Sequence, residues 1–142
     1  MTVRVSRTLD LDASPEDVWA FISDAGLRAG AISVVDSFEV HDDERATWHV
    51  ALPIPMMNST ISVETNDLQR DPPRHVKFVG KSRAFRVTGE HTITETETGS
   101  TLKNEFVVEG RLPGVESFFE RNFAKELDNL ETALREWLAT ER

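Results

Sequence analysis

The sequence predicts an α+β fold in which a seven-stranded curved antiparallel sheet wraps around a long C-terminal helix, in the order β-α-α-β6-α. Apolar and polar residues alternate over residues 2–12 and again in six segments between residues 33 and 110. Two short helical segments separate the first strand from the others, and residues 113–140 carry apolar side chains at helical spacing. At 142 residues the chain fits one domain, so residues 1–142 are expected to fold together.

Helix-start chemistry follows the first strand. Ser14 offers an N-cap hydroxyl, Pro15 suits the first helical position, and Glu16 and Asp17 lie where the helix dipole favours acids. These residues predict a helix over residues 15–23. The segment Asp24-Ala25-Gly26 is expected to break it before a second short helix over residues 27–31.

The middle of the chain is predicted to form a meander. Period-two patterning predicts strands at residues 33–41, 45–52, 59–67, 74–80, 83–95 and 100–110. Turn-forming pairs and triplets such as Asp42-Asp43 and Thr98-Gly99-Ser100 separate them. Because the connections are short, consecutive strands must pair antiparallel.

The C-terminal helix is long and amphipathic. It exceeds six turns, whereas the helices near the N-terminus are short and can close only one end of a curved sheet. The predicted sheet curls around this helix, and no other layer of similar length packs against it. Side chains of the predicted elements should therefore leave part of the enclosed space empty. The sequence therefore predicts an internal cavity between the sheet and the C-terminal helix.

Composition excludes several classes of function. The chain has no cysteine, so disulfides, thiolate metal ligands and cysteine nucleophiles are absent. A formal charge of -9 disfavours nucleic acid and anionic membrane surfaces as partners. With no secretory signal pattern and no long apolar run, we expect a cytoplasmic protein without a transmembrane segment. The acidic surface fits a salt-adapted organism and an ordinary cytosolic protein equally well.

Two motifs resemble a known superfamily. The run from Ala13 to Asp24 is similar to the opening strand-to-helix signature of the START-like or SRPBCC superfamily, and the run from Val108 to Gly114 is similar to its junction into the final helix. This polyketide cyclase/dehydrase and lipid-transport superfamily has the helix-grip fold, and the resemblance spans nearly the whole chain. Its small single-domain prokaryotic members, including the group associated with carbon monoxide dehydrogenase, look most similar.

The resemblance implies an elongated pocket and an entrance to it. The entrance would lie among the connections at residues 52–58, 80–84 and 110–114. We expect it to be formed by Ile54, Met56, Met57, Arg83 and Leu112. Apolar side chains at a hairpin tip are typical of pocket mouths and promiscuous surfaces, although the same side chains could also fold back onto the core.

Strand parity and helix spacing select residues that should face the interior. The predicted ligand-binding residues are Phe38, Trp48, Ile61, Val63, Phe78, Phe85, Val87, His91, Asn104, Phe106, Phe119 and Phe123. Val40 shares the inward phase of Phe38. Each apolar residue taken singly also fits an ordinary packed core, so the prediction of a binding site depends on the whole set.

His91 and Asn104 are the polar residues on this inward phase and the candidates for catalysis. An inward imidazole can act as a general acid or base, although a histidine that is satisfied by hydrogen bonds or exposed at the rim is the more common case. Arg83 and Arg86 face outward by parity unless a bulge reverses them. The four histidines lie on different strands without metal-ligand spacing, so neither a metal site nor a cofactor is predicted.

These features predict a protein that binds or transports a small hydrophobic ligand, such as a lipid, an isoprenoid or a polyketide-like compound. An alternative is a cyclase/dehydrase-type enzyme acting on a polyketide-like substrate, and the sequence leaves open whether the protein is an enzyme. A third hypothesis is a docking module that uses the apolar hairpin at residues 53–58 to bind a protein or a membrane.

Overall fold

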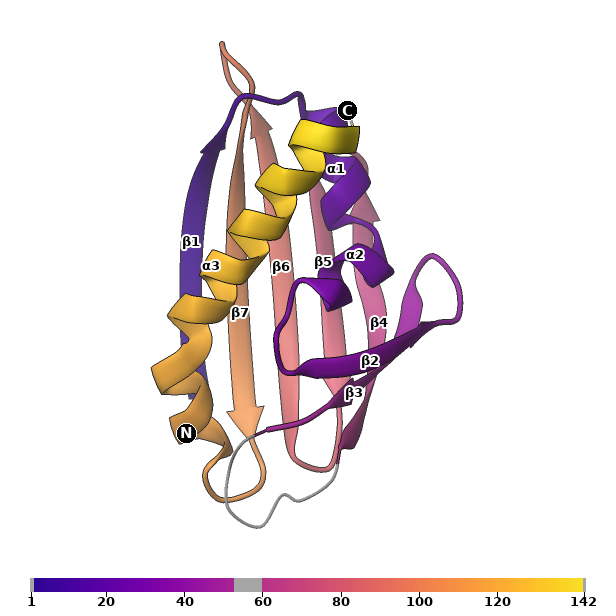
Figure 1. Cartoon of the computed structure of the whole chain (residues 1–142), viewed down its shortest axis with the longest axis vertical. Helices are drawn as coiled ribbons and strands as arrows, with labels where there is room; N and C mark the ends of the chain where they lie inside the picture. Colours follow the sequence, from indigo (N-terminus) through magenta and orange to yellow (C-terminus); the bar gives the residue numbers. More distant parts are fainter. Residues whose placement is uncertain (1, 53–59, 142) are drawn as a thin grey trace.

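The structure, a computed structural model, describes residues 2–52 and 60–141. Within these ranges one antiparallel sheet carries three helices on one side (Figure 1). The helices are α1 (Pro15–Ile22), α2 (Ala25–Gly30) and α3 (Val115–Glu141). The strands are β1 (Thr2–Leu11), β2 (Val35–Val40), β3 (Arg45–Val50), β4 (Ile61–Asp71), β5 (His75–Lys81), β6 (Phe85–Glu95) and β7 (Ser100–Gly110). The predicted α+β class and element order are confirmed.

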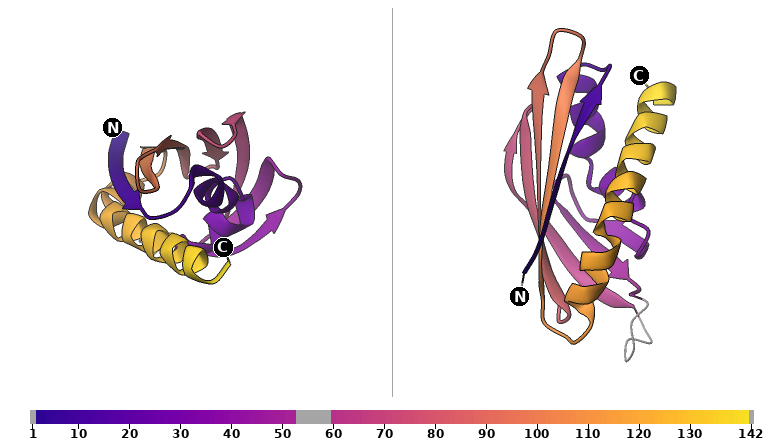
Figure 2. Two further views of the ribbon diagram at one scale, coloured as in Figure 1. Left: turned by 90° about the horizontal axis from the view of Figure 1, so that it is seen from above. Right: turned by 90° about the vertical axis from the view of Figure 1, so that its left-hand side faces the viewer.

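The sheet has the order β1-β7-β6-β5-β4-β3-β2, so the first strand pairs with the last and the others form a meander. Figure 2 shows the sheet bending around α3, which runs lengthwise along its concave side. This is the helix-grip arrangement. It places the two short helices and α3 on the same side of the sheet, and the interior lies between them and the central strands (Figures 1 and 2).

Side-chain caps determine where the two short helices begin. Ser14 Oγ accepts a hydrogen bond from the Asp17 amide at 3.2 Å, and Asp24 Oδ1 accepts one from the Leu27 amide at 2.9 Å. The prediction that residues 24–26 only interrupt the helical segments was wrong. Asp24 caps a new helix, so α2 begins at Ala25, and its residue Arg28 is buried against the interior.

Two register shifts lie in strands whose predicted boundaries differ from the structure. The pairing of β2 with β3 shifts between Val35 and Ser37, and β2 begins at Val35 instead of residue 33. The pairing of β4 with β5 shifts between Asp67 and Gln69, and β4 continues to Asp71. An extra residue breaks strict alternation, so a period-two pattern ends at a bulge even though the strand goes on.

Polar contacts hold α3 to the edge of the sheet, and apolar contacts hold it to the core. Arg7 of β1 forms an ion pair with Asp128, and Arg135 Nη2 donates a hydrogen bond to the Asp10 carbonyl at 3.3 Å. Near the C-terminus the Trp137 ring meets the Phe21 ring of α1 edge to face at 5.9 Å between centroids. These contacts fix both the slant of α3 over β1 and the end of the interior that α1 closes.

Candidate functional site

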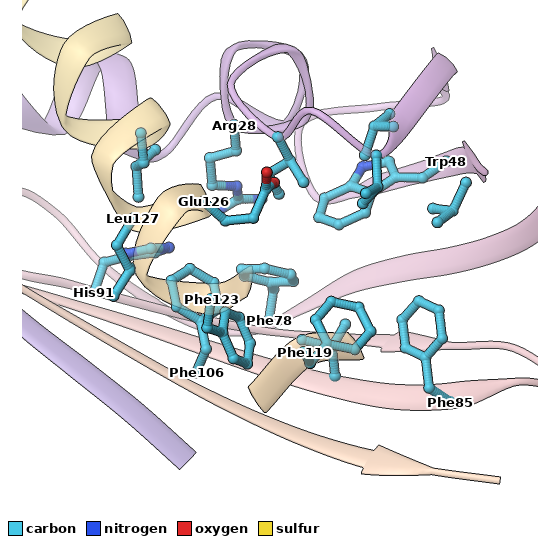
Figure 3. Close-up of a pocket in the computed structure, with 16 residues that line it drawn as sticks. Arg28, Trp48, Phe78, Phe85, His91, Phe106, Phe119, Phe123, Glu126 and Leu127 are labelled. Atoms are coloured by element: carbon cyan, nitrogen blue, oxygen red, sulfur yellow. The ribbon is translucent and has the colours of Figure 1, made fainter. Parts of the chain in front are cut away.

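A cavity of about 50 Å³ lies between the sheet, α2 and α3. Figure 3 shows phenylalanine rings gathered on one side of this space, with Arg28 and Glu126 on the other. Its lining consists of Arg28, Ile32, Val34, Val35, Trp48, Val50, Phe78, Phe85, Val87, His91, Phe106, Phe119, Phe123, Glu126, Leu127 and Leu130. Most of these side chains are apolar, and three of the sixteen are ionisable.

The apolar wall is a continuous series of touching rings from the sheet and the helix. Phe85 of β6 meets Phe119 of α3 at 5.3 Å between centroids, and Phe119 meets Phe123 at the same separation. Phe123 in turn lies 5.8 Å from Phe106 of β7. Helical spacing of four residues places Phe119 and Phe123 one above the other on α3. A flat or elongated apolar molecule would find aromatic faces and edges along this whole wall.

Gly89 determines how the Phe78 ring lies. A Cβ atom at Gly89 would lie 2.2 Å from Phe78 Cε1, so the ring of Phe78 occupies the space above this glycine. The ring then stacks on the His91 imidazole, with 6.1 Å between centroids and an angle of 18° between planes. The Arg28 guanidinium lies over the same ring at 4.8 Å from its centroid, a cation–π geometry.

His91 is fully buried and has one hydrogen-bond partner. Its Nδ1 donates to Asn104 Oδ1 at 2.7 Å, because an amide oxygen can only accept. Burial lowers the pKa of His91 from its ordinary 6.5 to about 3, and the nearby charge of Arg28 adds to this effect. The ring is therefore neutral at pH 7, with its proton on Nδ1 and a lone pair on Nε2.

Arg28 is a buried cation held by one shared carboxylate. Its Nη2 donates to Asp67 Oδ1 at 2.9 Å, and its Nη1 donates to the Ile22 carbonyl at 3.3 Å. The other oxygen of Asp67 accepts from Arg70 Nη1 at 2.6 Å. Burial lowers the pKa of Arg28, and the attraction of Asp67 opposes that effect. Arg28, Arg70 and Asp67 together carry one net positive charge, because one carboxylate contacts two guanidinium groups.

Three buried polar atoms of the lining residues have no hydrogen-bond partner within the described part of the chain. They are Arg28 Nε, Trp48 Nε1 and His91 Nε2. The first two are donors, and the third carries the lone pair left by the bond to Asn104. A buried polar atom without a partner costs roughly 1–3 kcal/mol, so a bound molecule that supplies the partner recovers this free energy.

Glu126 is the cavity carboxylate, and its oxygens already have partners. It accepts hydrogen bonds from the backbone amide of Ser33 at 2.9 Å and from the Ser33 hydroxyl. Asn129 Nδ2 donates to the same carboxylate at 3.2 Å. These contacts tie α3 to the segment between α2 and β2, whose residues Ile32 and Val34 line the cavity.

The structure brings eight of the twelve predicted ligand-binding residues into the cavity lining. They are Trp48, Phe78, Phe85, Val87, His91, Phe106, Phe119 and Phe123. Ile61 and Val63 are buried in the core beside β3 without lining the cavity, and Asn104 acts through His91. Whether these residues bind a ligand stays a prediction.

Phe38 and Val40 do not line the cavity. Phe38 pairs with Trp48 across the sheet, yet 39 % of Phe38 and 51 % of Val40 are exposed. They lie on the edge strand β2, and both approach Gly26 of α2. The register shift in β2 places Val35 in the cavity lining instead.

The described residues include only part of the predicted entrance, Arg83 and Leu112. Ile54, Met56 and Met57, like the whole hairpin at residues 53–58, lie outside the described residues. Arg83 and Leu112 are exposed, and neither lines the cavity. Arg86 lies in β6 and pairs with Lys81 and Glu109 of the neighbouring strands, so no bulge turns it inward.

The sequence reasoning missed Arg28, Asp67 and Glu126. Asp67 had a usable signal, because Ile61, Val63, Thr65 and Asp67 share one phase of β4 and a buried carboxylate requires a cation. The helix that carries Arg28 has only six residues, too few for periodicity to show which face is buried. Glu126 lies within the apolar stripe of α3. An acidic residue at such a position is readily taken to lie at the solvent-exposed border of the stripe.

Metal binding and membrane spanning find no support in the described residues. These residues contain no group of three or more His, Cys, Asp or Glu side chains placed to hold a metal ion. Nor do they include a helix that is both long and apolar enough to cross a membrane.

Comparisons with known proteins identify the fold and the family. A START superfamily protein from Mycobacterium smegmatis has 14 % identity and a TM-score of 0.77, with 98 % of this chain and 99 % of that chain covered. The Zhui aromatase/cyclase from Streptomyces sp. R1128 has 14 % identity and a TM-score of 0.72, with coverage of 97 % and 96 %. No curated protein matches the sequence significantly. The model of the polyketide cyclase/dehydrase and lipid transport family matches residues 2–135, and the chain belongs to this family.

Proposed function

We propose that this protein binds a small, flat, apolar molecule carrying polar substituents in the cavity between the sheet and α3. Membership of the family supports ligand binding or a cyclase-type function. The observation that carries the proposal is the cavity lining. It combines a continuous aromatic wall with three buried polar atoms that lack partners in the described structure. In an ordinary protein core, side chains pack against such an aromatic wall and leave no cavity. Buried polar atoms there normally have hydrogen-bond partners.

Binding requires the cavity to expand. Its volume of about 50 Å³ is room for a few water molecules, and the rings of Phe119 and Phe123 on α3 line it. A ligand of polyketide or isoprenoid size would have to displace these two rings or move α3 outward. This movement would break contacts between the aromatic rings of the wall. Contacts between those rings and the ligand would then take their place.

A binding role fits His91 better than a role as general base. A general base works best when its pKa lies near the operating pH, whereas that of His91 is about 3. A neutral imidazole whose Nδ1 is held by Asn104 can instead accept a hydrogen bond at Nε2 from a ligand hydroxyl. We therefore place the cyclase/dehydrase hypothesis second. In its favour is the structural similarity to an aromatase/cyclase from Streptomyces.

Denaturing extraction of the purified protein followed by mass spectrometry tests the binding proposal without a guess at the ligand. Native mass spectrometry of the same sample gives the stoichiometry. We expect one apolar organic molecule per chain, or uptake of one when the protein is incubated with an apolar extract. A protein that is isolated empty and takes up nothing would overturn the proposal.

Replacing His91 by Ala separates binding from catalysis. Once a ligand is known, weaker binding without any chemical change of that ligand supports a binding protein. Loss of turnover with retained binding supports the enzyme instead. The docking role of the hairpin at residues 53–58 and the cytoplasmic location both stay predictions.

A further inference from the structure

The cation of the cavity is incompletely neutralised. Arg28 is 4 % exposed, and the Asp67 carboxylate that it contacts is shared with Arg70. Asp24, a further acid whose field reaches Arg28, is exposed and caps α2 at its start. An arginine keeps its charge in proteins, so Arg28, Asp67 and Arg70 together carry one positive charge. Moving an isolated charge away from water costs several kcal/mol, and buried cations are normally paired. Asp67 alone therefore cannot neutralise both guanidinium groups.

No other lining residue of the described chain forms an ion pair with Arg28. Glu126 is the carboxylate among the lining residues, and Ser33 and Asn129 already bind its oxygens. His91 is neutral and supplies no counter-charge, because burial lowers its pKa to about 3. Arg28 Nε still has its N–H donor, without a partner among the described residues.

From this free donor and the shared carboxylate we infer that the ligand is an apolar carboxylic acid, bound as the carboxylate to Arg28. One carboxylate oxygen accepts from Nε–H of Arg28, and the apolar body lies against the aromatic wall at Phe106 and Phe123. The inference rests on the proposed function, because it names the chemistry of a ligand for the same cavity. A carboxylate adds the attraction between opposite charges to the hydrogen bond, so the guanidinium favours a carboxylate over an amide or an alcohol.

The overall charge of the protein makes this preference testable. A chain with a formal charge of -9 repels anions at its surface, so non-specific binding of an acid is disfavoured. Preference for an anionic probe over its neutral isostere must therefore come from a local cation. The described lining residues offer Arg28 alone for that role.

The experiment compares 2-naphthoate with 2-naphthamide at pH 7 by isothermal titration calorimetry. The two probes share one aromatic body and differ in charge. We expect the wild-type protein to bind 2-naphthoate at least about tenfold more tightly. Arg28→Gln should reduce this ratio to about one. Arg121→Gln removes one positive charge from the exposed face of α3 and should leave the ratio unchanged.

Arg28→Gln alone leaves Asp67 with only Arg70 and could unfold the chain. The double variant Arg28→Gln/Asp67→Asn replaces the ion pair by two amides and is the second test, with circular dichroism confirming its fold. Equal affinity of the wild type for both probes, or a preference that survives in a folded Arg28 variant, would overturn the inference and leave the proposed function standing. Failure of both probes and of a neutral apolar dye to bind would overturn the proposed function itself.

Discussion

His91 and Asn104 face each other across β6 and β7, with Nδ1 and Oδ1 2.7 Å apart, and this contact determines which ring nitrogen is turned to the cavity. The amide oxygen holds the ring proton on Nδ1. Nε2 then carries a lone pair in an apolar space, without a partner in the described residues. One hydrogen bond within the sheet thus leaves an acceptor, and not a donor, at Nε2 of the buried imidazole.

Removing the amide should destabilise the fold. Asn104→Leu keeps the size of the side chain but leaves the buried Nδ1–H of His91 without an acceptor. We expect the free energy of unfolding in urea to fall by about 1–3 kcal/mol. Asn66→Leu, on the exposed face of β4, should change it by less than about 0.5 kcal/mol. Equal effects of the two substitutions would mean that the bond to Asn104 contributes nothing.

The low pKa of His91 predicts a pH dependence of stability. The folded protein binds this proton near pH 3, whereas the unfolded chain binds it near pH 6.5, so between these values only the unfolded chain is protonated. This contribution to stability is complete above pH 6.5 and falls by about 1.4 kcal/mol per pH unit below it. Urea unfolding at pH 7.0 and 5.0 should therefore show a smaller loss in His91→Gln than in the wild type. His49→Gln, on the outer face of the sheet, is the control. If the His91 variant lost as much stability as the wild type, the imidazole would not be buried in its neutral form.

Two glycines give a matched pair of substitutions. The Phe78 ring above Gly89 is held by Trp48 on one side and His91 on another, so Gly89→Ala displaces a ring that has little freedom to move. We expect a loss of about 1–3 kcal/mol. An added Cβ at Gly30 meets nothing within 4 Å, and Gly30→Ala at the end of α2 should be neutral or slightly stabilising. Thermal unfolding of both variants checks this, and an unaffected Gly89→Ala protein would contradict the ring packing.

Asp67 should contribute much more to stability than an exposed acid in the same strand. Asp67→Asn leaves the buried Arg28 without its counter-charge and should cost about 3–5 kcal/mol. Asp71 forms an exposed pair with Arg74 at 3.3 Å, and Asp71→Asn should cost less than about 1 kcal/mol. Chemical denaturation of both variants, with the same pH and salt, measures the difference. Similar losses would show that the Arg28–Asp67 pair is open to water.

Local chemistry made the fold predictable. Ser14 and Pro15 mark the start of α1, and strand alternation placed Trp48, Phe78 and Phe106 correctly on the inner face. Because the connections are short, these patterns left only one simple way to pair the strands. The family resemblance then agreed with the matched family model over residues 2–135.

Other parts of the cavity lining were not predictable in the same way. A bulge between Val35 and Ser37 changes which residue of β2 faces inward, and alternation alone cannot locate such an insertion. Arg28 comes from a helix too short to show a period, and its burial depends on an acid 39 positions away in the chain. Contacts between distant segments of this kind are set by tertiary packing, for which the local pattern carries no signal.

A titration with the neutral dye 1-aminoanthracene tests most directly whether the cavity binds ligands. The wild type should show saturable binding with one site per chain. Val87→Phe enlarges a side chain that lines the cavity and should weaken binding at least about tenfold, whereas Thr88→Phe adds the same ring on the outer face of β6 and should not. Thermal unfolding confirms that each variant is folded. No binding by the wild type, or equal binding by both folded variants, would contradict a ligand site between the sheet and α3.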